Sequence, residues 1–283
     1  MTIDDNIRFA KKLLVENIYH SINIEGIAMT FPETQTIVDG MSVKGHRIED
    51  INAVNDLKNA WYYILDTIQK DYAEPVTLKH IQKINHVLGR FTVLNAGHIR
   101  NMFDEPVGIG GTSWQPSLPP KEAEIEQELA RILSNSDIYE AALDLFCYIV
   151  RRQLFLDGNK RTATLASNMY LIGHGAGIFS IPAEKKESFY KELIAYYESG
   201  DAKNLKEFLY PCITKSYTKT LGQRLQILRQ NAGLNREQAA IKLAIPKERL
   251  FSLELDEEIP TNEELVRICG YFEMEPEVLT DLS

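Results

Sequence analysis

Long apolar runs, paired cysteines and metal-binding clusters are all missing from this sequence of 283 residues. No apolar run approaches the ~20 residues that a membrane-spanning helix needs, and no secretory signal opens the chain. The three cysteines, Cys147, Cys212 and Cys269, are odd in number and far apart. Such a set argues against disulfides and against zinc. These absences predict a cytoplasmic protein with free buried thiols and no membrane partner.

The pattern of apolar residues is helical over most of the chain. Apolar content is 44% and charged content 25%, as in ordinary globular proteins. At this length we expect two domains, residues 1–214 and 221–283, joined by a linker near Lys215 to Thr220. Strands are few, so the predicted fold class is all-α with one small β-hairpin. Apolar residues recur at three-and-four spacing over 7–24, 47–71, 77–88, 122–133, 137–152, 159–172, 183–198 and 204–214.

The segment 153–163 joins two of these helical patterns and carries the strongest chemical signal. A Gly158-Asn159 turn that opens a helix points backbone N–H groups and the positive end of the helix dipole outward. Lys160 and Arg161 add two cations, and Asp157 could hold a divalent cation that bridges phosphates. Together these features indicate a nucleotide, although a Gly-Asn turn taken alone is more often a simple helix cap.

The same segment resembles the signature of the Fic (Fido) family, His-Pro-Phe-x-Asp/Glu-Gly-Asn-Gly/Lys-Arg. By this resemblance Asp157 holds Mg²⁺, and the Gly158-Asn159 backbone with Arg161 binds the phosphates of ATP. Tyr190 stands where the family often contacts adenine, although an aromatic residue at helical spacing is more often part of a core. The matching residues are Phe155, Asp157, Gly158, Asn159, Lys160 and Arg161.

Two departures from the signature bear on activity. Gln153 replaces the histidine that serves the family as base, and Thr164 replaces a second arginine. A carboxamide cannot accept a proton at accessible pH. The resemblance therefore implies AMP transfer from ATP to a Ser, Thr or Tyr hydroxyl of a target protein, with weak or absent activity here.

Two further motifs strengthen the resemblance. Ser21 to Gly26 matches the inhibitory pattern Ser/Thr-x-x-x-Glu-Gly/Asn, in which Ser21 and Glu25 share a helix face and Gly26 suits the turn that ends the helix. In the family the inhibitory glutamate pairs with the second arginine, so the partner of Glu25 is open here. The alternative is a surface glutamate at a helix end.

The second motif runs from Ala96 to Pro120 and resembles the family's flap. Short β-branched stretches between glycines predict a hairpin, with Ile109, Gly110 and Gly111 as the part that pairs with an extended target by strand addition. His98 is expected to serve packing or the surface rather than catalysis.

Residues 221–283 resemble a phage-repressor type of helix-turn-helix domain of five short helices. Asn235 is a predicted helix cap, and Ala239-Ala240 are small enough for two helices to cross closely. From residue 220 onward, however, seven Lys/Arg face twelve Asp/Glu, a net charge of −5. DNA affinity rests largely on a basic surface. Arg229, Arg236, Lys242, Lys247 and Arg249 could form a local basic stripe, but a protein-contact or dimer role is favoured over DNA.

The sequence therefore predicts a degenerate protein adenylyltransferase of the Fic type that uses ATP and Mg²⁺. One alternative is a nucleotide-sensing or DNA-binding transcriptional regulator. Another is a phosphotransferase like the Doc toxin, which Lys160 and Thr164 suggest. A homodimer is possible, and no target protein or operator can be named from the residues.

Overall fold

The computed structural model describes residues 2–71, 75–91, 93–215, 221–255 and 257–280. It divides into two compact units, Met1–Lys215 and Ser216–Ser283, which we call the N-terminal and C-terminal units. The expected linker falls mainly on residues 216–220, which lie outside the described residues. Among the helices that are described, none is both long and apolar enough to cross a membrane.

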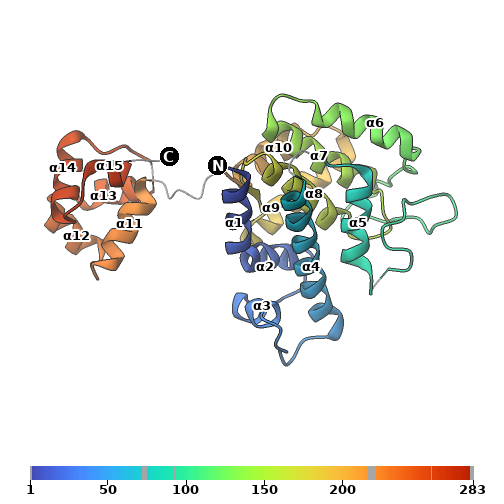
Figure 1. Cartoon of the computed structure of the whole chain (residues 1–283), viewed down its shortest axis with the longest axis horizontal. Helices are drawn as coiled ribbons and strands as arrows, with labels where there is room; N and C mark the ends of the chain where they lie inside the picture. The colour runs from blue at the N-terminus through green and yellow to red at the C-terminus, as the bar shows by residue number, and fades with distance from the viewer. Residues whose placement is uncertain (1, 72–74, 92, 216–220, 256, 281–283) are drawn as a thin grey trace. The chain divides into compact units, whose positions relative to one another are not determined.

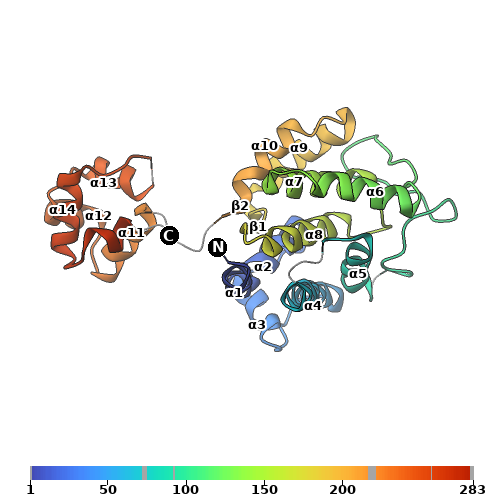
Figure 2. The same cartoon turned by 45° about the horizontal axis from the view of Figure 1, so that its top comes forward.

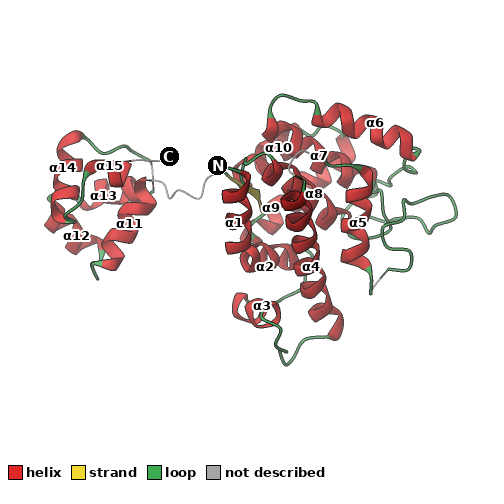
Figure 3. Ribbon diagram, in the orientation of Figure 1, coloured by secondary structure: helices red, strands yellow, loops and turns green. Residues whose placement is uncertain are grey.

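The N-terminal unit is a helical bundle, which confirms the all-α prediction (Figure 3). Most of its helices lie close to the predicted bounds. They are α1 (Ile3–Lys12), α2 (Leu14–Ile24), α3 (Phe31–Val38), α4 (Ile48–Lys70), α5 (Leu78–Gly89), α6 (Glu122–Leu133), α7 (Ile138–Arg152), α8 (Asn159–Gly173), α9 (Lys186–Ser199) and α10 (Lys203–Leu209), with 3-10 turns at Ala183–Lys185 and Tyr210–Cys212.

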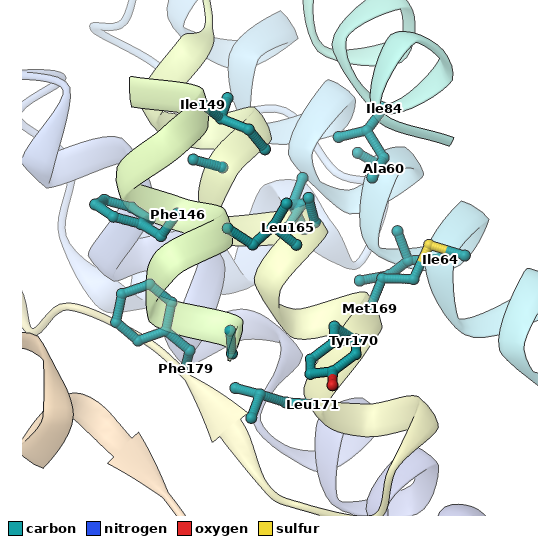
Figure 4. Packing of buried hydrophobic residues seen from close by; sticks show 14 of the residues in the cluster. Ala60, Ile64, Ile84, Phe146, Ile149, Leu165, Met169, Tyr170, Leu171 and Phe179 are labelled. Atoms are coloured by element: carbon teal, nitrogen blue, oxygen red, sulfur yellow. The ribbon is translucent and has the colours of Figure 1, made fainter. Parts of the chain in front are cut away.

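Helices α7 and α8 form the centre of this unit, and α4 and α5 pack against α8. Both central helices bury side chains all round their axes, as expected for helices surrounded by others. Figure 4 shows Phe146 and Ile149 of α7 facing Leu165 of α8, with Met169 of α8 against Ile64 of α4. The six-residue turn between α7 and α8 is thus held at the end of the most buried pair of helices.

The only strand pair among the described residues lies away from the flap segment, residues 96–120. Strands β1 (Ile178–Phe179) and β2 (Ile213–Thr214) are antiparallel, with Ile178 opposite Thr214. The flap segment, predicted as a hairpin, is instead a loop that projects from the bundle between α5 and α6 (Figure 2). A lone hairpin is marginal in water, and here prolines and glycines interrupt both of its arms.

The N-terminal helices differ from the prediction in two places. The stretch 7–24 was expected as one helix but is broken at Leu13. Phe9 and Leu14, both 6% exposed, would lie about 140° apart on a continuous helix, and the break lets both face the core. Helix α3 was missed, although Thr30 and Glu33 form the capping box that marks its start.

Within its described residues, 221–255 and 257–280, the C-terminal unit has five short helices around its own core. Asn235 caps the second helix in a capping box, and Ala239 and Ala240 are buried as expected where α12 meets α13. Leu225, Leu250 and Ile268 are fully buried in the same core. The helices are α11 (Leu221–Asn231), α12 (Arg236–Leu243), α13 (Lys247–Glu254), α14 (Asn262–Tyr271) and α15 (Pro276–Thr280).

Candidate functional site

The turn between α7 and α8 has two left-handed residues at its ends. Gln153 ends α7 with φ +44°, and Gly158 precedes α8 with φ +76°. Gly158 offers no side chain to cap the helix, so the first backbone N–H groups of α8 are left for another acceptor. A Cβ at this position would lie 3.2 Å from Asn85 Nδ2. Glycine therefore suits both the backbone and the close packing.

A cleft of about 360 Å³ opens in front of this turn. Its walls come from the turn, the start of α8, helix α9, the C-terminal end of α2 and the flap segment. Nine of the predicted site residues line it: Glu25, Ile109, Gly110, Gln153, Asp157, Gly158, Asn159, Lys160 and Tyr190. Five others, Ser21, Gly26, Gly111, Phe155 and Arg161, do not line it.

The Gln153 side chain is buried and its amide is fully engaged. Nε2 donates to the carbonyl of Val150 at 2.7 Å and to Tyr197 Oη at 3.2 Å. Oε1 accepts from Asn159 Nδ2 at 2.9 Å. Burial raises the pKa of Tyr197, so this phenol stays protonated near neutral pH. Gln153, at the position of the family's histidine base, is therefore fixed by hydrogen bonds. None of the side chains in this network can accept a proton near neutral pH.

Asn159 fastens the turn through its side chain. The backbone N–H of Phe155 donates to Asn159 Oδ1 at 3.0 Å, and Asn159 Nδ2 donates back to the Phe155 carbonyl at 2.7 Å. Phe155 itself is 1% exposed and belongs to the core. The Asn159 side chain is therefore used in hydrogen bonds within the turn. The backbone N–H of Asn159 is the first N–H group of α8.

Glu25 meets a cation from the turn itself. Its Oε2 lies 3.4 Å from Lys160 Nζ, and both side chains are partly buried. Burial by itself lowers the pKa of Lys160, but the Glu25 carboxylate and Tyr190 outweigh it, and the net shift is upward. Thr164, at the position of the family's second arginine, donates its hydroxyl to the Lys160 carbonyl instead.

Two more donors hold the C-terminal end of α2 over the cleft. Lys186 Nζ donates to the Asn23 carbonyl at 2.9 Å, and Tyr190 Oη donates to the Ile24 carbonyl at 3.1 Å. Lys160 Nζ also lies 5.6 Å from the centre of the Tyr190 ring. The carbonyls of Asn23 and Ile24 thus accept hydrogen bonds from α9, and the Glu25 carboxylate pairs with Lys160 of α8.

Arg161 points to a different space. Its Nη2 donates to Asp157 Oδ2 at 3.0 Å, and its side chain is only 13% exposed. Its Nε is buried without a hydrogen-bond partner among the described residues. The side chain lines an inner cavity of about 30 Å³, together with Ser21 and Thr164. Lys160 is thus the cation that lines the outer cleft.

Asp157 is the carboxylate at the N-terminus of α8 that could contact a metal. The part of the chain that the structure describes holds no group of three or more His, Cys, Asp or Glu placed to bind an ion. Mg²⁺ is commonly held by one or two carboxylates with substrate phosphates and water. Asp157, which is 58% exposed, fits that pattern only in company with a phosphate.

Sequence reasoning missed the residues that support the turn from behind. Asn85 Nδ2 donates to the Asp157 carbonyl at 2.9 Å, while its Oδ1 accepts from the Gly97 N–H at 2.9 Å. The buried Arg100 donates from Nε to the Gln153 carbonyl and from Nη2 to the Ser117 carbonyl, both at 2.8 Å. Residues 96–100 were recognised as part of the flap motif. Their role in supporting the turn from behind could not be predicted from the sequence.

His98 lies outside this network. It is exposed, its Nε2 is 2.9 Å from Asn101 Nδ2, and it does not line the cleft. This agrees with the surface role expected of it.

Comparison with known proteins identifies the domain that carries this site. Residues 75–171 match the sequence profile of the Fic/DOC family. This part of the chain is a Fic/DOC family domain. The Fic domain includes the turn and the flap segment, whereas Glu25, Lys186 and Tyr190 come from helices outside the matched residues.

Relatives and solved structures agree with that assignment. Protein adenylyltransferase Fic of Drosophila mojavensis is 29% identical over 241 residues, which cover 79% of this chain and 45% of that protein. The chain spans about half the length of the curated relatives it matches. A Fic domain containing signaling protein from Bacteroides thetaiotaomicron has a TM-score of 0.59 at 18% identity, covering 72% of this chain and 85% of that one. Fic-1 from C. elegans has a TM-score of 0.59 at 21% identity, with 70% and 59% covered. At these identities the structures show the fold of the Fic domain.

The C-terminal unit uses its cations internally. The buried Glu254 accepts from Arg229 and from Arg236, the latter at 2.8 Å. Lys247 pairs with Glu237. Arg249 pairs with Glu258 and with Glu264, and Lys242 donates to Tyr271 Oη. Four residues of the expected basic stripe are therefore paired with carboxylates of the same unit, and the fifth, Lys242, contacts a tyrosine.

Proposed function

We propose that the cleft of the Fic domain binds ATP with Mg²⁺ and that the protein is a degenerate adenylyltransferase with weak or no AMP transfer. One observation carries the proposal. The uncapped N-terminus of α8, Lys160 and Asp157 line the same open cleft. Backbone N–H groups, a dipole and a cation favour a phosphate.

Each group would have a defined part. The N–H groups of α8 and Lys160 would hold phosphates, and Asp157 would hold Mg²⁺, which neutralises phosphate charge when bound. Tyr190, on the wall formed by α9, would contact the base. Gln153 could orient a target hydroxyl but not deprotonate it. Loss of a positioned base typically costs about 10²–10⁴ in rate.

The protein target would approach along the flap segment. Ile109 and Gly110 line the cleft in a loop without strand partners. An extended segment that carries a Ser, Thr or Tyr could pair with this backbone by strand addition. The alternation of side chains along such a segment would place its hydroxyl toward Gln153.

The pair of Glu25 with Lys160 supports an inhibited resting state. A phosphate that reaches Lys160 must displace the Glu25 carboxylate or lie beside it, and two negative charges at such distances repel. In this proposal Lys160 takes the place of the second arginine as the partner of the inhibitory glutamate. The anchors at Lys186 and Tyr190 would hold α2 in the inhibiting position.

Labelled ATP separates the remaining functions. Transfer of label from the α-phosphate supports an adenylyltransferase. Transfer from the γ-phosphate would instead support a Doc-like phosphotransferase. Binding of ATP and Mg²⁺ in a calorimeter without transfer of either label fits both a transferase that has lost activity and a nucleotide-sensing regulator. Transfer of the α-label by a Gln153→His variant supports the first, and no transfer by that variant supports the second. Absence of binding would defeat the proposal. Glu25→Gln should be tested alongside wild type, so that an inhibited site is not mistaken for a dead one.

For the C-terminal unit we propose a helix-turn-helix type of module that contacts protein, including a second copy of the chain, rather than DNA. The internal ion pairs of Arg236, Lys247 and Arg249 support this choice. Sedimentation of the full chain and of a variant that lacks residues 216–283 would test this proposal. Loss of self-association on truncation is expected, and a monomer in both cases would count against a dimer role.

A further inference from the structure

A second pocket, of about 410 Å³, opens between the last turn of α7, helix α9 and the flap segment. It shares no lining residue with the nucleotide cleft. We call it the basic pocket. Its lining residues are Trp114, Gln115, Ser117, Tyr148, Arg151, Arg152 and Tyr196.

Arg151 and two aromatic rings form the fixed wall of the basic pocket. The Arg151 guanidinium lies 5.3 Å from the centre of the Trp114 ring and 5.2 Å from that of Tyr196. Its Nη1 donates to the carbonyls of Tyr196 and Tyr197 near the end of α9. This arginine is committed to structure, but its positive charge still faces the pocket.

Arg152 is the cation available to a ligand. It is exposed, and its guanidinium lies 5.8 Å from the centre of the Tyr148 ring. Within the described ranges it makes no ion pair with a carboxylate, and no Asp or Glu lines the pocket. The two guanidinium groups are positively charged and donate only, while the Gln115 amide and the Ser117 hydroxyl can each donate as well as accept. The complementary ligand is therefore an oxyanion.

The flap segment connects the basic pocket to the cleft. Ile109 and Gly110 line the cleft, and Trp114 to Ser117 line the basic pocket. The Trp114 ring stacks on Tyr197 with centres 4.9 Å apart and planes 6° apart. Tyr197 Oη in turn accepts from the Gln153 amide. An extended chain laid along the flap would pass from one pocket to the other.

We propose that the basic pocket binds the carboxylate side chain of an Asp or Glu in the protein segment whose hydroxyl enters the cleft. This inference rests on the proposed function, because it assumes a protein target along the flap. Arg152 would pair with the carboxylate, and the partly exposed Trp114 ring would contact its methylene groups. The pocket would thus select targets by an acidic residue at a fixed distance from the modified hydroxyl.

The test measures binding of fluorescein-labelled 12-residue peptides to the full chain by anisotropy. Each peptide carries a central Thr and one Glu, placed two to six residues to either side, with Ala and Ser elsewhere. Each has a counterpart with Gln in place of Glu. In at least one register the Glu peptide should bind about tenfold tighter than its counterpart, as expected for a charge-assisted hydrogen bond. Arg152→Gln should remove that preference.

Arg8→Gln serves as the matched control, because Arg8 is an exposed arginine on α1, paired with Asp5 and outside both pockets. It should leave the preference intact. Equal binding of Glu and Gln peptides in every register would overturn the proposal, as would a preference that survives Arg152→Gln. Calorimetry with ATP on the same preparations reports on the cleft separately. A preference for Glu without ATP binding would sink the proposed function and leave the basic pocket standing.

Discussion

Lys160 Nζ and Glu25 Oε2 lie 3.4 Å apart across the mouth of the cleft. One residue comes from the first turn of α8 and the other from the end of α2, 135 positions earlier in the chain. The cation best placed to receive a phosphate is therefore occupied by a carboxylate from a different element. Occupation of the cleft and docking of α2 compete for the same ammonium group.

Glu25→Gln should tighten the binding of ATP with Mg²⁺. The change removes one negative charge and releases Lys160, while the amide keeps the size of the side chain. A partly screened charge at ~4–6 Å is worth on the order of 1–3 kcal/mol, or roughly 5- to 150-fold in Kd. Calorimetry measures the change. Glu16→Gln, on the same helix but facing His20, is the control; equal affinities in all three proteins would remove Glu25 from the mechanism.

Gln153→His should raise AMP transfer in the Glu25→Gln background. An imidazole has an unperturbed pKa of about 6.5 and can accept a proton near neutral pH. The gain should exceed about tenfold but fall short of the 10²–10⁴ of a fully placed base, because Leu154 and Thr164 still depart from the family signature. α-Labelled ATP and a cell lysate provide the assay.

Gln127→His, at an exposed position of α6, controls for an added histidine elsewhere. Adding Thr164→Arg should increase transfer further, because a second cation joins the phosphate site. Wild-type transfer as fast as that of the Gln153→His protein would mean that the site works without a histidine base.

Gly97→Ala should destabilise the Fic domain. Gly97 has φ +84°, and a Cβ there would lie 2.6 Å from the Gln82 carbonyl oxygen. The left-handed backbone costs about 1–2 kcal/mol and the overlap about 1–3 kcal/mol more. Urea unfolding followed by fluorescence of Trp61 and Trp114 measures the loss. Gly108→Ala, where a Cβ meets nothing within 4 Å, should be nearly neutral; a similar loss in both variants would contradict the argument.

The helices and the turn motif could be read from the sequence, because amphipathic spacing and the Gly158-Asn159 pair are local features. Contacts between distant segments could not. Nothing in residues 21–26 specifies that Glu25 meets Lys160, because the usual partner position holds Thr164. Nor does a motif reveal that Asn159 is committed to the turn or that Arg161 faces an inner cavity. The prediction of a hairpin in the flap segment was wrong because a strand needs a backbone partner. Among the described residues, none pairs with this loop as a strand.

The C-terminal unit should lose stability in acid. The pKa of Glu264 is lowered from its ordinary 4.5 to about 2, mainly because Arg249 donates hydrogen bonds to its carboxylate. Burial acts in the opposite direction, and hydrogen bonds from Thr261 lower the pKa further. A carboxyl whose pKa is lower in the folded state stabilises fully above pH ~4.5, and this contribution is lost as the pH falls toward 2. Amide resonances of residues 247–271 should report unfolding over this window.

Glu264→Gln keeps a side-chain oxygen to cap α14 but cannot titrate. It should therefore weaken the pH dependence between 4.5 and 2. Glu263→Gln, at the neighbouring exposed position, should leave the profile of wild type unchanged. An unaltered profile in the Glu264→Gln protein would assign the acid sensitivity to other carboxylates.

Non-specific DNA should bind the full chain weakly at physiological salt. The net charge of −5 from residue 220 onward repels the duplex, and Lys247 and Arg249 are paired. Replacing Glu237 and Glu258 by Gln should release Lys247 and remove two negative charges, while Arg249 stays paired with Glu264. Affinity should therefore rise, with a steeper dependence on salt. A mobility-shift titration at several salt concentrations checks both points. Tight, steeply salt-dependent binding by the wild type would point to DNA recognition.

Arg100 gives the two pockets a common mechanical support. A single buried guanidinium bonds the backbone at Gln153 on one side and the backbone at Ser117 on the other. A shift of the flap segment that admitted a ligand would move a guanidinium whose other hydrogen bond fixes the start of the turn between α7 and α8. Coupling between two binding sites is reciprocal. If a ligand on the flap changed the affinity of the turn for a nucleotide, the nucleotide would change the affinity of the flap for that ligand by the same factor. If both ligands bind as proposed, the affinity of each pocket would depend on whether the other is occupied.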